Sequence, residues 1–409
     1  MHKVQTLELT DSITEEMRGY VAAMRDGFFE TPVDEQGMEL WHRLVLEDRT
    51  RLRAIYDPER PFGLKDQPVA TFASWDATIN TGRELAPTNM ITDVTVQASH
   101  RRQGLMNALM TLDLEQARER GAVFAALTAT DARIYSRFGF GVSATARSIE
   151  LNTGPRFQLV TQPTGRVEFA DASTITDVRR TIFDEFHDRQ FWSVERANHY
   201  WVTGFDWKTQ TTEHQRAAVH LDANGKPDGF VVFIVRDDHL LIRDLLGLNI
   251  AAELELLRTL AHTEGHEKVL WPRCYNRRHP LTWALADHRV AKTVSEYDTV
   301  WVRIMDVERA LSMRAFDNDG RAVIAVDDPM GQVSGTYALE VRDGVAAVER
   351  TDAEPDVTMQ LATLAALYSG LAHPLELAAA GTIDGSHEGL MRVGTLFVKD
   401  LPGIAAAIF

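Results

Sequence analysis

Residues 90–106 read MITDVTVQASHRRQGLM, and this stretch decides the fold of the first third of the chain. Its first seven residues are rich in β-branched side chains, which favours a strand. A polar, basic turn follows, with one glycine, Gly104. Leu105, Leu109 and Leu112 then recur at helical spacing, and Gly121 lies just past the expected helix end. This order predicts an anion site, because a helix start leaves backbone N–H groups unpaired and its dipole favours negative charge.

A second informative segment lies downstream, where an apolar run at 125–130 leads into IYSRFGFG at residues 134–141. Together the two segments resemble the GNAT superfamily of acetyl-CoA-dependent N-acetyltransferases, in which Arg101-x-x-Gly104 would match the pyrophosphate-binding signature. The last residue of that signature is usually small and is Met106 here. The resemblance extends to the enhanced-intracellular-survival (Eis) family, whose members carry a similar Arg-Arg-x-Gly-Leu turn and Ile-Tyr-x-Arg-Phe-Gly stretch.

The resemblance implies an acetyl-CoA site built from both segments. The strand backbone at 94–96 would hydrogen-bond the acetyl-pantetheine arm, and the basic turn would hold the pyrophosphate. On the residues alone, the turn could be a solvated basic loop and the valines could be strand core. The expected coenzyme-binding residues are Val94, Thr95, Val96, Arg101, Arg102, Gln103, Gly104, Leu105, Met106 and Thr130.

Tyr135 is the expected general acid of such a site. An unperturbed phenol titrates near ~10 and a thiol near ~8.5, so a tyrosine stays protonated yet can pass a proton to a departing thiolate. The alternative is a half-buried structural tyrosine. The flanking Arg137-Phe138-Gly139 run, which matches the family pattern, favours the catalytic interpretation.

The chain end, LPGIAAAIF at residues 401–409, has no charged side chain. Chain ends are usually polar, and an apolar end favours burial, which would carry the terminal carboxylate inward. In the Eis family the C-terminal Phe carboxylate enters the active site as the base, and Phe409 matches that position. Simple docking of the tail is the alternative. By the same resemblance, Phe28, Glu30 and Trp41 would flank the acceptor pocket, and Asp93 stands where relatives can carry an aromatic residue.

With 409 residues, the chain exceeds one ordinary domain. We expect an α/β (α+β) architecture, with tandem GNAT folds whose mixed central sheets are flanked by helices, followed by a sterol-carrier-like α+β domain. The expected bounds are 1–151, 152–305 and 306–409. Residues 240–262 repeat the strand, turn and helix order, but their turn at 247–249 lacks the arginine pair, so no acetyl-CoA is expected there. Asn224-Gly225 between two apolar runs predicts a hairpin.

Composition limits the class of protein. The net charge of −16 argues against a nucleic-acid partner and for cationic or neutral small molecules, although solubility alone would explain it. The sequence contains no uncharged apolar run of ~18 residues, so no membrane helix is expected. The first residues do not resemble a signal peptide. A single cysteine, Cys274, fits a reducing compartment, so a cytoplasmic location is expected. His262 and His266 have no third ligand nearby, so no metal is expected.

These observations predict an enzyme. It would transfer acetyl groups directly from acetyl-CoA to primary amines of cationic small molecules, aminoglycoside-like or polyamine-like. The resemblance also implies a homohexamer. Two alternatives stay open, namely a protein-lysine acetyltransferase and an acyl-CoA-binding or lipid-binding module without turnover.

Overall fold

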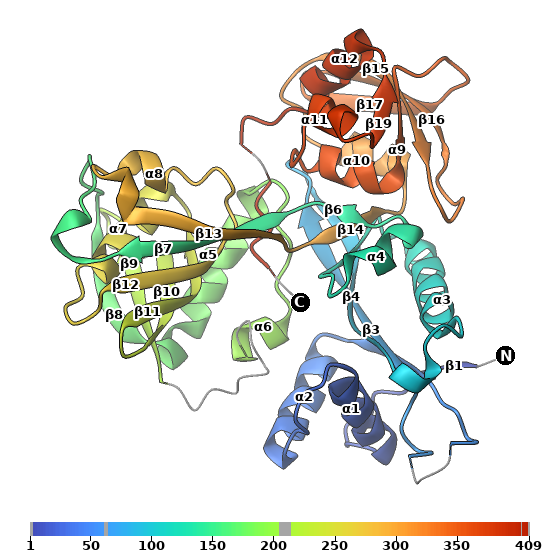
Figure 1. Cartoon of the computed structure of the whole chain (residues 1–409), viewed down its shortest axis with the longest axis horizontal. Coiled ribbons are helices and arrows are strands. Elements are labelled where there is room, and N and C mark those ends of the chain that lie inside the picture. The colour runs from blue at the N-terminus through green and yellow to red at the C-terminus, as the bar shows by residue number, and fades with distance from the viewer. Residues whose placement is uncertain (1–2, 61–63, 204–213, 402, 408–409) are drawn as a thin grey trace.

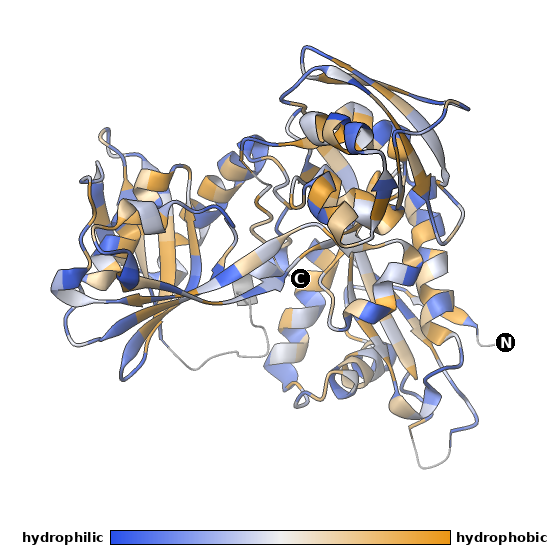
Figure 2. Ribbon diagram, turned by 45° about the horizontal axis from the view of Figure 1, so that its top comes forward, coloured by the Kyte–Doolittle hydropathy of each residue, from blue (hydrophilic) through white to orange (hydrophobic). Residues whose placement is uncertain are grey.

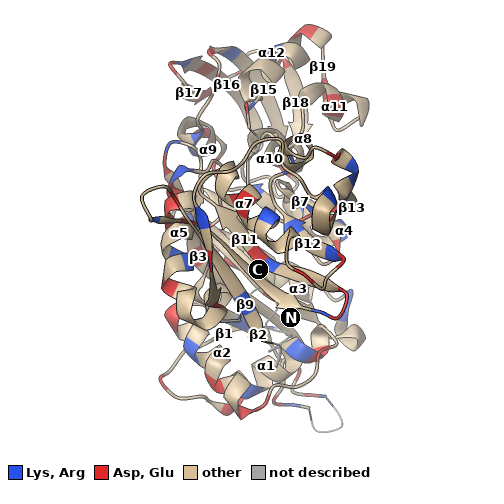
Figure 3. Cartoon of the chain, turned by 90° about the vertical axis from the view of Figure 1, so that its left-hand side faces the viewer, with Lys and Arg blue, Asp and Glu red and all other residues tan. Residues whose placement is uncertain are grey.

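A computed structural model describes residues 3–60, 64–203, 214–401 and 403–407. These residues form three sheets with flanking helices (Figure 1). Each sheet combines parallel and antiparallel strand pairs, so the predicted mixed architecture is confirmed. Apolar residues are concentrated along the strands, whereas charged residues of both signs are interspersed over the outside (Figures 2 and 3). No helix in the described ranges is long and apolar enough to cross a membrane.

The first sheet carries the stretch quoted above on its fourth strand, β4. Helix α3 covers one face of this sheet and α1 packs against the other. In sheet order the strands are β1 (Val4–Leu7), β2 (Arg51–Ile55), β3 (Ala70–Asn80), β4 (Leu85–Val96), β5 (Phe124–Leu127), β14 (Trp301–Ile304) and β6 (Gly141–Val142). The helices are α1 (Glu15–Gly27), α2 (Glu35–Glu47), α3 (Leu105–Glu119) and α4 (Ala132–Tyr135).

The second sheet repeats the plan of the first: in each, a helix connects the two strands of a central parallel pair. Its two faces carry separate apolar clusters, one under α7 and the other under α5. In sheet order the strands are β13 (Ala291–Asp298), β7 (Thr145–Asn152), β12 (Lys268–Cys274), β11 (His239–Gly247), β10 (Pro227–Val235), β9 (Gln215–Leu221) and β8 (Arg166–Asp171). The helices are α5 (Thr176–Arg189), α6 (Asn198–Thr203), α7 (Ile250–Ala261) and α8 (Leu281–Ala284).

The third sheet is smaller and belongs to the last quarter of the chain. Its strands in sheet order are β17 (Val345–Arg350), β16 (Gly335–Arg342), β15 (Gly320–Asp327), β18 (Val357–Gln360) and β19 (Ile383–Gly385). Its helices are α9 (Val307–Met313), α10 (Leu361–Tyr368), α11 (Pro374–Ala379) and α12 (His387–Phe397). Its core is continuous with that of the first sheet, so the two units pack as one body.

Two strands are exchanged between the first two sheets. β7 follows β6 directly in sequence but pairs with β12 and β13 in the second sheet. β14 returns from the far end of the second unit and lies between β5 and β6 in the first sheet (Figure 1). The chain therefore crosses between these sheets at residues 143–144 and 299–300, and the expected bounds at 151 and 305 stay a prediction.

Candidate active site

The turn between β4 and α3 is open toward solvent. Arg102 and Gly104 both adopt left-handed backbone conformations, with φ of +64° and +79°. Gly104 is the N-cap of α3, has no capping side chain, and has no atom within 4 Å of where a Cβ would lie. Arg101 and Arg102 are exposed on the same turn. The first-turn N–H groups of α3 therefore point out of an uncapped, electropositive helix end, which suits a diphosphate.

The corresponding turn of the second sheet is filled. Asn249 caps α7 by accepting a hydrogen bond from the Ala252 N–H at 2.9 Å. The Glu253 carboxylate accepts from the Gly247 N–H at 3.1 Å, and a Cβ at Gly247 would approach the Glu253 side chain at 2.8 Å. A carboxylate therefore occupies this helix end, where an anionic ligand would otherwise bind.

β4 leaves the edge of the sheet open beside the basic turn. Its parallel pairing with β5 spans only residues 88–91 and 124–127, whereas β4 continues to Val96. A bulge on β4 opposite Phe72 contains Asp93, whose φ is +54° and whose carbonyl accepts a 2.7 Å hydrogen bond from the Thr71 hydroxyl. Within the described residues, the β5-facing edge of 92–96 thus has no strand partner and can pair with an extended ligand.

Tyr135 ends the short helix α4 and is 4% exposed. Its ring packs in the same apolar cluster as Leu105 and Met106 of the first turn of α3. Burial raises the pKa of the Tyr135 phenol above its usual value, and a hydrogen bond with the Thr130 side chain acts in the opposite direction. The phenol is therefore protonated at neutral pH, as a proton donor must be.

The third domain braces the loop that carries Tyr135. A Cβ at Gly141 would overlap the Ala362 carbonyl, so β6 packs directly on the backbone of α10. Arg303 of β14 is fully buried, donates to the Phe138 carbonyl at 2.7 Å, and forms two 2.8 Å bonds with the Asp328 carboxylate. This buried ion pair joins the first sheet to the third domain immediately behind the tyrosine loop.

A group of polar side chains lies on the face of β4 opposite α3. Burial raises the pKa of the Asp93 carboxyl to about 6, with His199 of α6 acting to lower it and Glu30 acting to raise it. Glu30 pairs with Arg25 at 2.8 Å, and both side chains are less than 10% exposed. The Trp75 ring meets His199 edge-on at 5.4 Å, beside a cavity of about 340 Å³ that Trp75 lines. The carboxyl groups of Asp93 on β4 and of Glu30 in the loop after α1 therefore lie near each other on this side of the sheet.

The chain end runs between the first two sheets. Ala405, Ala406 and Ala407 are each at most 2% exposed. Ala405 and Ala407 belong to the core that includes Trp75, whereas Ala406 packs into the core of the second sheet. The expected burial of the apolar tail is thus present at residues 405–407 but not at Leu401, which is 68% exposed. Phe409, the predicted base, lies outside the described residues.

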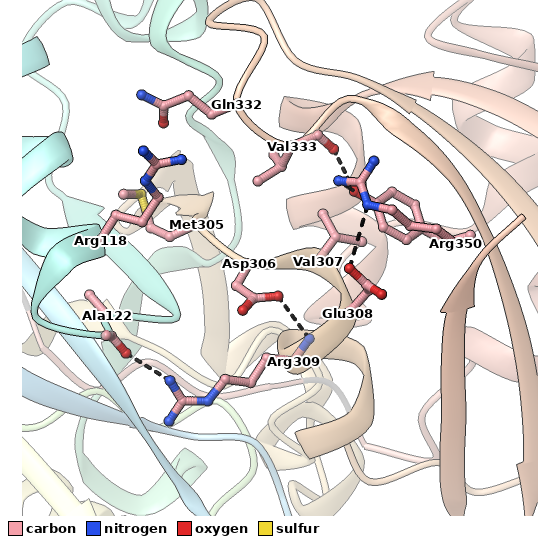
Figure 4. Close-up of a pocket in the computed structure, with 12 residues that line it drawn as sticks. Arg118, Ala122, Met305, Asp306, Val307, Glu308, Arg309, Gln332, Val333 and Arg350 are labelled. Atoms are coloured by element: carbon pink, nitrogen blue, oxygen red, sulfur yellow. Dashed lines mark hydrogen bonds and ion pairs between the residues drawn. The ribbon is translucent and has the colours of Figure 1, made fainter.

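Another cavity, of about 240 Å³, lies at the far end of α3 (Figure 4). Arg309 reaches across it to the Gly121 carbonyl at 2.9 Å, and Arg350 pairs with Glu308 at 3.5 Å. Gly121 lies a whole helix beyond Gly104, about 25 Å away at 1.5 Å per residue. This cavity is therefore a seam between domains, separate from the candidate active site.

Known proteins match the chain along most of its length. Residues 10–143 and 193–304 each match an acetyltransferase (GNAT) domain, and residues 307–404 match a sterol carrier protein domain. The N-acetyltransferase Eis of Mycobacterium tuberculosis is 29% identical over 78% of this chain and 80% of its own length. An uncharacterized N-acetyltransferase of Streptomyces avermitilis is 30% identical over 94% of both chains. The chain belongs to the Eis-like GNAT N-acetyltransferases.

A solved structure supports the fold independently. Eis1 from Mycobacterium abscessus superposes with a TM-score of 0.84 at 21% identity, covering all of both chains. The prediction of tandem GNAT folds followed by a sterol-carrier-like domain is therefore confirmed. So is the prediction of an enzyme of the GNAT N-acetyltransferase class.

The structure groups the expected site residues into two sets. The coenzyme set and Tyr135 lie around the start of α3, with Val94, Val96, Leu105, Met106 and Tyr135 in or against one apolar cluster. Among the expected acceptor residues, Glu30 is close enough to influence Asp93. Phe28 and Trp41 pack in the cluster between α1, α2 and the sheet, with Trp41 stacked 6.1 Å from Tyr20.

Sequence reasoning did not select His199 or Arg196 for this Eis-like site. Both belong to the middle third, which was interpreted as a repeat of the plan without the chemistry. Asp48 positions His199. The Asp48 carboxylate accepts from the backbone N–H of His199 and lies 3.3 Å from its ring Nδ1. A contact 151 residues away along the chain leaves no local signal, so only the folded structure could reveal it.

Proposed function

We propose that this enzyme transfers an acetyl group from acetyl-CoA to a primary amine of a cationic small molecule, such as an aminoglycoside or a polyamine. The observation that carries the proposal is the juxtaposition of three features around the start of α3. These are an uncapped helix end with two exposed arginines, an open strand edge, and a buried protonated phenol. The carboxyl groups of Asp93 and Glu30, which interact on the opposite face of β4, support a cationic acceptor.

In the proposed reaction, the amine nitrogen attacks the thioester carbon, a C–N bond forms and the C–S bond breaks. Tyr135 gives its proton to the departing thiolate, and the Phe409 carboxylate receives the proton that the amine loses. Backbone groups at 94–96 would hold the pantetheine arm, and Arg101, Arg102 and the N–H groups of 104–106 would hold the pyrophosphate. A carboxyl group near ~3.5 is a weak base, so desolvation of the amine must assist it.

Thiol release from acetyl-CoA, measured across aminoglycosides, polyamines and lysine peptides, tests this function. Tyr135→Phe should lower kcat by about 10²-fold or more with little change in the KM for acetyl-CoA. Tyr337→Phe is the control, because it also removes a buried phenol hydroxyl but lies in the third domain. That hydroxyl donates to the Val333 carbonyl at 2.7 Å and accepts from Arg350 at 2.9 Å.

Each alternative predicts a different pattern in this panel. Turnover confined to lysine peptides would indicate a protein-lysine acetyltransferase. Binding of acetyl-CoA without thiol release on any amine would indicate a binding module. An unchanged kcat in Tyr135→Phe would refute the proposed acid. By resemblance we also propose a homohexameric, cytoplasmic enzyme, which light scattering and cell fractionation test.

A further inference from the structure

A buried arginine of the second sheet's unit holds the chain end. Arg196 has a fully buried side chain, and its Nε donates to the Ala406 carbonyl at 2.8 Å. Its two terminal nitrogens each lie 3.1 Å from an oxygen of the Asp244 carboxylate on β11. The forked guanidinium therefore connects the sheet rigidly to the tail, three residues before the chain ends.

The surroundings fix the orientation of this guanidinium. It lies 4.4 Å from the ring centre of Phe183 and 4.0 Å from that of Tyr200, so aromatic rings confine the plane of the fork. Two backbone hydrogen bonds of the described tail residues are longer and lie nearer its beginning. The Gly403 and Ile404 N–H groups donate to the Ser369 and Phe191 carbonyls at 3.3 and 3.2 Å.

A charge at this position needs an explanation, because ordinary docking of an alanine segment requires only apolar contacts. Burying an arginine and an aspartate costs desolvation energy, and an apolar pair of similar volume would often be at least as stable. The ion pair adds direction. One N–H that donates to one carbonyl fixes the position of the tail backbone.

We propose that Arg196, oriented by Asp244, is a positioning residue for catalysis that fixes the C-terminal segment so that the terminal carboxylate meets the acceptor amine. This inference rests on the proposed role of the Phe409 carboxylate. Arg196 is not itself a catalytic residue, since it acts through the backbone of the tail.

The test compares Arg196→Met with Arg179→Met in the full chain. Arg179 is a matched control because it is also buried and also bonds Asp244 at 3.1 Å. It packs on the rings of Trp201 and Phe230, and its bonds within the described residues do not involve the tail. Arg196→Met should lower kcat at least 10-fold with the KM for acetyl-CoA within about 2-fold, whereas Arg179→Met should keep kcat. If Arg196→Met does not fold, Arg196→Lys serves, since lysine keeps the charge but loses the fork.

Two further measurements separate positioning from stability. In a chain that lacks Phe409, Arg196→Met should change kcat by less than 2-fold, because the group it positions is gone. Carboxypeptidase should release terminal residues faster from Arg196→Met than from Arg179→Met. The inference would be overturned if carboxypeptidase released terminal residues equally fast from the two variants and their kcat values were equal. It would also be overturned if Arg196→Met lowered kcat as much in the chain that lacks Phe409 as in the full chain. If removing Phe409 leaves kcat unchanged, the proposed base fails, and the release rates still decide whether Arg196 anchors the tail.

Discussion

Replacing Asp93 by asparagine should make the protein more stable while it impairs the proposed reaction. The carboxyl group lies on the bulge of β4, where burial raises its pKa from 3.8 to about 6. The groups that act on it come from several elements, namely Tyr20 of α1, Glu30 of the following loop and His199 of α6. Asparagine keeps the shape and removes the charge.

The sign of the effect follows from the two pKa values. The folded chain holds the Asp93 proton up to about pH 6, whereas the unfolded chain releases it near 3.8. Stability from the protonated form is therefore fully present below about pH 4 and is lost as the pH rises through 6. The values differ by about 2.2, which corresponds to about 3 kcal/mol at most.

Thermal unfolding of the wild type and Asp93→Asn between pH 4.5 and 8 measures this difference. The variant should melt at a higher temperature, and its advantage should grow as the pH rises to about 7. Asp76→Asn is a control of opposite sign, because hydrogen bonds and charge from Arg51 outweigh burial and hold the pKa of Asp76 below its usual value. A destabilised Asp93→Asn protein, or an advantage that does not change with pH, would refute the reasoning.

The same variant tests the acceptor pocket. A carboxylate beside the attacking amine stabilises its ammonium form on binding, so Asp93→Asn should raise the KM for cationic acceptors several-fold. The KM for acetyl-CoA should not change. For the wild type, acceptor KM should fall as the pH rises through 6, because only ionised Asp93 attracts the cation. Gained stability with lost acceptor affinity is the usual compromise at functional sites.

Three further substitutions have defined outcomes. Gly104→Asp should raise the KM for acetyl-CoA at least 10-fold by placing a charged side chain where φ is positive and the diphosphate would bind, measured by steady-state kinetics. Gly141→Ala should lower the melting temperature and kcat together, because its Cβ would overlap the Ala362 carbonyl and separate the tyrosine loop from α10. Arg303→Met should cost roughly 3–5 kcal/mol in urea unfolding by leaving the buried Asp328 carboxylate without its cationic partner. Asp328→Asn in the same chain should restore part of the loss, because it removes the charge but keeps an oxygen that can accept from the backbone N–H groups of this turn.

Local patterns predicted the core of the site. β4 ends at Val96 and α3 begins at Leu105, as the β-branched run and the leucine spacing indicated. The Asn224-Gly225 hairpin also forms, with Gly225 at φ +81° between β9 and β10. These elements depend on interactions between residues close in sequence, such as turn geometry and one-sided apolar spacing, which sequence reasoning can use.

Elements defined by distant contacts escaped prediction. β14 has only four residues and takes its place from pairing with β5 and β6, more than 150 residues earlier. Helix α12 was not predicted because it contains Gly389 and Gly394, which disfavour helices. The structure explains both glycines: a Cβ at Gly389 would overlap the Asp356 carbonyl, and one at Gly394 would lie 2.7 Å from His373. Close packing, not helix propensity, selected these residues.

Contacts between distant residues also give the second GNAT unit a structural role, although it has no open anion site. Its helix end is filled by Asn249 and Glu253, so it cannot contribute a coenzyme site of the kind at Gly104. It contributes instead Arg196, which bonds the tail, and α6, whose His199 acts on Asp93. The third domain holds Arg303 and the tyrosine loop from the other side. An isolated first domain would therefore keep the residues proposed to bind acetyl-CoA but lose the contacts that hold the loop of Tyr135, the proposed acid, and the tail.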